Sequence, residues 1–305
     1  MMDDITGAGL TSRVLSREDL PLFLRGQLLG FALDDYFDGA YMGAFGPDGR
    51  PAGFIFTGHE SDEDEVLIGV PHVSPEWSGP PELVQSFLLD TVVRKLLDPE
   101  DRRCSRAVAA VYSDQEEGER RRLEEAYGTL GFEFYRDSQI YARSLTDDLR
   151  EPGRSLTYRS VDDVGDAEFA ALCKSTATGS DFEGTDFEAL VARYRRGARF
   201  DPELFSVAYT TDGEEGGETR PVGVFMARLD LLVPSEAAFY YIGVMPGLRS
   251  GGYGSDLLLK CLGLLRERGA TKTREIVPST SGGAIALLRK HGYELLEWAR
   301  YFVRY

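Results

Sequence analysis

The stretch Val244–Leu258, VMPGLRSGGYGSDLL, decides how the rest of the chain is interpreted. Apolar and aromatic residues precede it and leucines at helical spacing follow it, so it predicts a strand, a glycine-rich loop and a helix. Such a loop aims unpaired backbone N–H groups into one concavity at the positive end of a helix dipole, where a phosphate binds well. Its core, Arg249–Gly254, fits R-x-x-G-x-G, a pattern short enough to occur by chance in a chain with 34 glycines.

Length and composition narrow the class of protein. The 305 residues are enough for two domains, and 42% hydrophobic with 28% charged residues is typical of a globular protein. Neither a membrane-spanning run nor a signal sequence is recognisable, and the three cysteines lack metal-ligand spacing. We therefore expect a cytoplasmic protein with reduced thiols, without a membrane partner and without a metal.

The formal net charge is −17. A phosphate backbone normally needs a basic protein face, so we expect no nucleic-acid partner. A negative field instead favours the approach of a cationic ligand, although general acidity for solubility explains the same charge.

The chain repeats one plan at about half its length. AFGPDGRPAGFIF (44–56) matches AYTTDGEEGGETRPVGVFM (208–226), and each predicts two antiparallel strands around an Asp-Gly turn. Later, each half has a helix that ends at a glycine, Gly131 or Gly292, before an aromatic residue and a final strand. Each half also opens with a strand and an acidic helix start, at 13–23 and at 158–169.

The polar segment LTDDLREPGRSL predicts a domain boundary near residue 151. We therefore expect two domains, at 1–150 and 151–305, of a mixed α/β (α+β) class. Each should contain a mixed, mostly antiparallel sheet flanked by helices.

This order of elements around R-x-x-G-x-G resembles the GNAT superfamily of acyl-CoA-dependent N-acyltransferases. The resemblance covers 155–305 well and 10–148 in degenerate form. It implies acetyl-CoA as acyl donor, with the diphosphate bound at the loop and the pantetheine arm along the end of the preceding strand. The coenzyme-binding residues that it implies are Val244, Met245, Arg249, Ser250, Gly251, Gly252, Gly254, Ser255 and Ser281, the last standing where the family has an asparagine.

The first half lacks the donors that this loop needs. Aligning Pro75 with Pro246 places Pro80 and Pro81 at Gly251 and Gly252, and proline has no N–H to offer a phosphate. We expect the first domain to be structural or substrate-shaping, and the second to hold the active site.

N-acylation needs a neutral amine and a hydrogen-bond donor that stabilises the oxyanion of the reaction. A backbone N–H near Gly243 or Val244 is expected to stabilise the developing oxyanion. Some members of the family have a glutamate base at the position of Ala238, and the family's usual tyrosine acid is replaced by Leu288. Glu236 and Tyr240 lie on the same strand face as Ala238 and are the catalytic candidates; the alternatives are a solvated turn residue for Glu236 and sheet packing for Tyr240.

The acidic segment GSDFEGTDFE (179–188) either selects a cationic amine or forms a solvated loop and helix cap. His291 follows a helix end and is expected to interact with the helix dipole. The sequence thus favours an acetyltransferase of a small primary amine that acts by direct transfer. A non-catalytic acyl-CoA-binding regulator and, against the charge, an aminoacyl transferase that uses charged tRNA are the alternatives. The acceptor, the acyl chain and the oligomeric state stay open.

Overall fold

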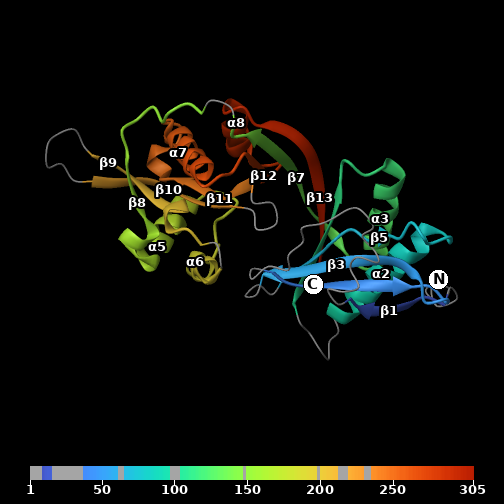
Figure 1. Cartoon of the computed structure of the whole chain (residues 1–305). Helices are drawn as coiled ribbons and strands as arrows, with labels where there is room; N and C mark the ends of the chain where they lie inside the picture. The colour runs from blue at the N-terminus through green and yellow to red at the C-terminus, as the bar shows by residue number, and fades with distance from the viewer. Residues whose placement is uncertain are drawn as a thin grey trace. The chain divides into compact units, whose positions relative to one another are not determined.

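The computed structural model describes residues 9–15, 37–60, 65–96, 104–146, 149–197, 200–211, 219–229 and 235–305 (Figure 1). These fall into two compact units. The first unit comprises residues 1–138 and 297–305, and the second comprises residues 139–296. None of the helices in these ranges is long and apolar enough to cross a bilayer.

The first unit combines a mixed sheet with two described helices. Its elements are β1 (Thr11–Val14), β2 (Phe37–Phe45), β3 (Pro51–Glu60), β4 (Glu65–Ile68), β5 (His72–Val73), α2 (Pro81–Leu96), β6 (Arg106–Tyr112), α3 (Glu117–Thr129) and the first part of β7 (Glu133–Ser144). Strands β1 to β4 pair antiparallel in order, β5 pairs with β3, and β4 pairs parallel with β6.

The second unit has the same order of pairing. Its elements are β8 (Thr157–Ser160), α4 (Val161–Val164), α5 (Asp166–Ala177), α6 (Phe187–Arg196), β9 (Phe205–Thr211), β10 (Thr219–Leu229), β11 (Glu236–Val244), α7 (Tyr253–Glu267), β12 (Lys272–Pro278), α8 (Gly282–Lys290) and the start of β13 (Glu294–Arg304). Strands β8 to β11 are antiparallel and β12 is parallel to β11. The expected class, a mixed and mostly antiparallel sheet with helices, is confirmed.

Two strands are exchanged between the halves of the sequence. The last strand of the second half, β13, joins the sheet of the first unit, and the last strand of the first half, β7, joins the sheet of the second unit. Ala299–Arg304 of β13 pair with Ala107–Tyr112 of β6 in the first unit. The end of β7 lies beside β12 in the second unit, where Leu145 N–H donates to Thr271 O. The compact units therefore differ from the expected division at 151, because a strand's own residue pattern does not identify its pairing partner.

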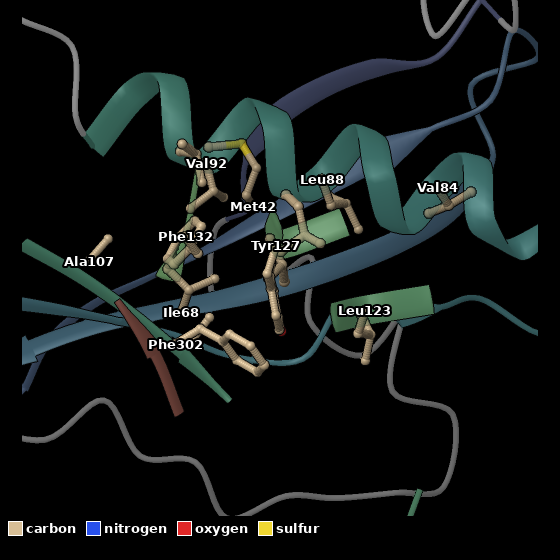
Figure 2. Packing of buried hydrophobic residues seen from close by; sticks show 14 of the residues in the cluster. Met42, Ile68, Val84, Leu88, Val92, Ala107, Leu123, Tyr127, Phe132 and Phe302 are labelled. Atoms are coloured by element: carbon tan, nitrogen blue, oxygen red, sulfur yellow. The ribbon is translucent and has the colours of Figure 1, made fainter. Parts of the chain in front are cut away.

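The core of the first unit lies between α2, α3 and the sheet. Val84, Leu88 and Val92 of α2 point toward the strands, as Figure 2 shows, and each is at most 2% exposed. Tyr127 of α3 is fully buried, and its hydroxyl donates to Ala110 O at 3.3 Å. In the repeat, Tyr127 occupies the position that corresponds to Leu288 in the second half, and it is a core residue.

The expected hairpin of the first half is confirmed. Gly49 has φ of +76°, and Gly46 N–H donates to Arg50 O across the turn between β2 and β3. Strands β9 and β10 form the second hairpin, but its Asp-Gly turn lies outside the described residues. The helix expected after β1 also lies outside them.

Two glycines at matching places mark where the sheet touches a helix. A Cβ on Gly53 would lie 2.4 Å from His72 O and 2.6 Å from Val84 Cγ1. A Cβ on Gly223 would lie 2.4 Å from Gly243 O and 2.7 Å from Leu257 Cδ1. In each unit a glycine thus lets a strand approach a neighbouring carbonyl and the helix above it.

We expect Gly53→Ala and Gly223→Ala each to lower the free energy of unfolding by about 1–3 kcal/mol, because the added methyl overpacks against backbone. Gly263→Ala in α7 is the matched control: its Cβ would meet nothing within 4 Å, so it should stabilise by about 0.5–1 kcal/mol. Urea denaturation measures all three. Equal stability of Gly223→Ala and wild type would contradict the close approach.

Candidate active site

The glycine-rich loop joins β11 to α7. A single 3₁₀ turn, η3 (Pro246–Leu248), opens it, and Gly252 is the N-cap residue of α7 with φ of +88°. Ser250 has φ of +63° and is the non-glycine residue with a left-handed backbone among those described. The chain therefore turns sharply enough to direct several N–H groups outward.

Hydrogen bonding divides these N–H groups into two sets. Gly251 N–H donates to Leu248 O at 3.3 Å, and Ser255 N–H donates to Gly252 O at 3.0 Å. Within the described residues, the N–H groups of Ser250, Gly252, Tyr253 and Gly254 have no acceptor. An anion at this helix N-terminus would therefore meet a donor set that includes Tyr253, which the sequence-based prediction did not include.

Arg249 fixes the loop to the neighbouring helix α5. Its Nη2 donates to Thr176 O at 2.9 Å and to Thr178 O at 2.6 Å, and its Nε donates to Val244 O at 3.3 Å. Two of these carbonyl groups lie at the C-terminal end of α5, where the helix dipole favours a cation. The described contacts of Arg249 thus position the loop.

The site opens where β11 and β12 separate. Their parallel ladder consists of Glu236–Lys272 and Ala237–Thr273, although both strands continue beyond these pairs. From Ala238 onward, the edge of β11 that faced β12, here called its open edge, has no ladder partner among the described residues. This separation leaves backbone groups of β11 without a β12 partner.

A β-bulge at Tyr240 decides which N–H groups face this separation. Phe239 pairs with Ala227 and Tyr241 pairs with Met226, so Tyr240 is the extra residue. Met245 N–H donates to Val222 O of β10. Because successive N–H groups of a strand point to opposite edges, those of Val244 and Ile242 point toward the separation.

Glu275 of β12 is a residue that the sequence-based prediction missed. Its side chain is 2% exposed, and its carboxylate accepts from Phe239 N–H at 3.3 and 3.4 Å. Burial raises the pKa of Glu275 well above its usual range, and the Phe239 hydrogen bond lowers it in part. The segment KTREIVP has no apolar–polar alternation that could have identified Glu275 as buried, because Thr273 and Glu275 point inward while the apolar Ile276 is exposed.

The structure places the two catalytic candidates, Glu236 and Tyr240, in different surroundings. Glu236 forms an ion pair with Lys272 at 3.2 Å and lies eight residues before Val244, roughly 25 Å along an extended strand. Tyr240 is half-buried, with its ring 5.8 Å from Phe182 and from Tyr194. Tyr240 thus lies along the open edge, whereas Glu236 lies at the paired end of β11.

Tyr241 is the second tyrosine near the open edge. It is 4% exposed, its hydroxyl lies 3.1 Å from Thr176 Oγ1, and burial raises its pKa to about 12. A Cβ on Gly243 would lie 2.5 Å from this hydroxyl, so glycine is required for the close packing of β11 on α5.

Ser281 and the acidic segment meet in the structure. Ser281 is the N-cap residue of α8, but its hydroxyl donates to Asp181 instead of capping the helix. Glu183 accepts from Gly179 N–H, and Asp186 caps α6 by accepting from Ala189 N–H. These contacts fit the loop-and-cap interpretation of the segment.

The remaining candidates have structural positions. Leu288 is 1% exposed. His291 is the C-cap residue of α8, and burial lowers its pKa, which disfavours the cationic form that a dipole contact needs. The described residues contain no group of three metal-ligating side chains.

The corresponding loop of the first unit differs at the donor positions. Helix α2 begins at Pro81 and α7 begins at Tyr253. Aligned by these helix starts, Pro80 and Pro81 stand at Gly252 and Tyr253, two of the residues with unpaired N–H groups. The first unit therefore lacks these donors whether the loops are aligned by sequence or by helix start.

Solved structures share the fold along most of the chain. A GCN5-related N-acetyltransferase from Sphaerobacter thermophilus is 18% identical, with a TM-score of 0.62, over 97% of this chain and 95% of that chain. A tandem GNAT protein from the clavulanic acid biosynthesis pathway is 13% identical, with a TM-score of 0.62, over 97% and 98%. A glucosamine N-acetyltransferase region of a fungal multi-domain β-N-acetylglucosaminidase is 13% identical, with a TM-score of 0.67, over 97% and 38%.

Residues 175–293 match the sequence model of the acetyltransferase (GNAT) family. This range of the chain is thus a GNAT domain. Proteins of this family are N-acyltransferases that take an acyl group from acyl-CoA. The matched range contains the glycine-rich loop, β11, β12 and α8. The search of curated proteins gave no match.

The burial of Glu275 predicts a pH-dependent stability. An unfolded glutamate has a pKa of about 4.3, and the folded value is raised, so the folded chain binds this proton more tightly. Glu275 therefore contributes most to stability below about pH 4.3, and its contribution falls as the pH rises toward the folded pKa.

We expect the Tm of Glu275→Gln relative to wild type to increase between about pH 5 and about pH 8, because glutamine cannot ionise. Circular dichroism melting curves measure this difference, with the exposed Glu294→Gln as the matched control. A difference in Tm that is constant with pH would contradict the buried carboxyl.

Proposed function

We propose that the second unit is an acetyl-CoA-dependent N-acetyltransferase of a small primary amine, which acts by direct transfer in a ternary complex. The observation that carries this proposal is the juxtaposition of two features. Unpaired N–H groups of the loop suit the diphosphate, and the open edge of β11 suits the pantetheine arm that leads away from it. The GNAT family match supports the assignment of acyl-CoA to this pair of features.

In the proposed reaction, the amine nitrogen attacks the thioester carbonyl carbon and the carbon–sulfur bond breaks. The N–H groups of Val244 and Ile242 stabilise the oxyanion that forms on the carbonyl oxygen. The amine loses one proton to solvent water, the departing thiolate gains one from a side-chain donor, and that donor regains its proton from solvent. Tyr240 is the proposed donor to the thiolate, because Leu288 occupies the place of the family's tyrosine.

The proposed acceptor is a primary amine, with a cationic one favoured by the net charge of −17. The carboxylates of Asp181, Glu183 and Asp186 accept hydrogen bonds from neutral groups within the chain, so they keep their negative charge but already have partners. We propose that the first unit is a degenerate copy with a structural or substrate-shaping role.

Calorimetry tests the coenzyme site. We expect one coenzyme A site per chain and at least about a tenfold loss of affinity in Gly252→Ala, because alanine disfavours the positive φ that presents the loop donors. Gly247→Ala is the matched control, since its Cβ would meet nothing within 4 Å. Two equivalent sites per chain would contradict the assignment of binding to the second unit alone.

Release of free thiol from acetyl-CoA with a panel of amines tests catalysis. We expect Tyr240→Phe to lower kcat by about tenfold or more with little change in the Kd for acetyl-CoA, because a positioned acid contributes about 10²–10⁴-fold. Tyr241→Phe is the control, since the Tyr241 hydroxyl is already held by Thr176. A wild-type rate in Tyr240→Phe would make Tyr240 a packing residue.

The replacement of the family's acid by Leu288 also favours a second candidate, a non-catalytic acyl-CoA-binding regulator. Binding of acetyl-CoA without thiol release across the amine panel would support it.

A further inference from the structure

The segment that leads into β8 lies on the first turn of α7. Gly153 N–H donates to Asp256 Oδ1 at 2.7 Å, and Arg154 Nη1 donates to Asp256 Oδ2 at 2.6 Å. Arg154 Nη2 also donates to Gly251 O, and the guanidinium carbon lies 4.7 Å from the ring centroid of Tyr253. Arg154, about 100 positions earlier in the chain, thus contacts the glycine-rich loop and the first turn of α7.

Asp256 explains why Arg154 is held there. Its side chain is 4% exposed, and a buried carboxylate needs a partner. The two hydrogen bonds to Asp256 and to Gly251 fix the plane of the guanidinium and use two of its five N–H donors. The Arg154 side chain is 43% exposed, so further donors remain open to solvent.

The guanidinium also borders the unpaired loop donors. A Cβ on Gly252 would lie 3.0 Å from Arg154 Nη1 and 3.1 Å from Nη2. A phosphate bound by the N–H groups of Gly252 and Tyr253 would therefore lie beside a preoriented cation. Arginine is well suited to bind such a group, because its charge-assisted N–H donors match phosphate oxygens.

We infer that Arg154 binds the diphosphate of coenzyme A and that Asp256 is the residue that positions it. This inference rests on the proposed function and adds to it a coenzyme-binding residue from outside the glycine-rich loop. In this arrangement, Asp256 supplies the fixed geometry, and Arg154 offsets the Asp256 charge beside an anion site.

Three ligands separate the phosphates in calorimetry. Coenzyme A carries the diphosphate and a 3′-phosphate, dephospho-coenzyme A carries only the diphosphate, and pantetheine carries neither. We expect Arg154→Gln to weaken the first two ligands equally, by about 10- to 100-fold, and to leave the third unchanged. Arg154→Lys should give an intermediate loss, because the charge remains but the fork is lost.

The matched control is Arg266→Gln, an exposed arginine near the other end of α7, roughly 20 Å away at 1.5 Å per residue. It removes the same charge and should change none of the three affinities. Absence of coenzyme A binding by the wild-type chain would overturn the proposed function itself. Normal binding by the wild type and by Arg154→Gln alike would overturn only the role of Arg154.

A double variant separates phosphate binding from neutralisation of Asp256. If Arg154 acts only by offsetting the buried charge, Arg154→Gln with Asp256→Asn should regain wild-type affinity, and the inference fails. If Arg154 contacts the diphosphate, the double variant stays at least about tenfold weaker than wild type. A loss for coenzyme A that is absent for dephospho-coenzyme A would also overturn the inference, since it would assign Arg154 to the 3′-phosphate.

Discussion

Backbone N–H groups on a strand edge need acceptors, and the edge of β11 that faces β12 loses its ladder after two residue pairs. The site of the second unit depends on how this edge is completed. Glu275 takes the first freed N–H, that of Phe239. The bulge at Tyr240 then turns the N–H groups of Ile242 and Val244 toward the same side, where a ligand rather than a strand can accept from them.

The loop beyond this edge is held by side chains on both sides. Arg249 ties it to the end of α5, and the Arg154–Asp256 pair ties it to the segment before β8. Because these contacts fix the loop through arginine side chains and carbonyl groups, several loop N–H groups stay free. Donors that are fixed before binding cost little reorganisation when an anion arrives.

The first unit shares the plan of the second but not the donors of its glycine-rich loop. It keeps the order of strands, and Gly53 makes the same kind of close approach to a helix that Gly223 makes. Prolines at the start of α2 nevertheless remove the donors from the corresponding loop. The first unit also has its own apolar core around Leu88 and Tyr127, as the proposed structural or substrate-shaping role requires.

The sequence by itself determined the strand, loop and helix at 244–258, the hairpin around Gly49 and the missing backbone N–H donors at Pro80 and Pro81. These features depend on local spacing, on positive φ at glycine and on the missing N–H of proline, all of which are properties of short segments. Only the tertiary structure decided which sheet β7 and β13 join. The residue pattern of each segment predicts a strand, but it does not identify the strand with which it pairs. The tertiary structure also decided the partners of polar side chains: Glu275 with Phe239, Ser281 with Asp181, and Arg154 with Asp256. Each pair joins residues that are 36 to about 100 positions apart, and such contacts arise from packing rather than from local sequence.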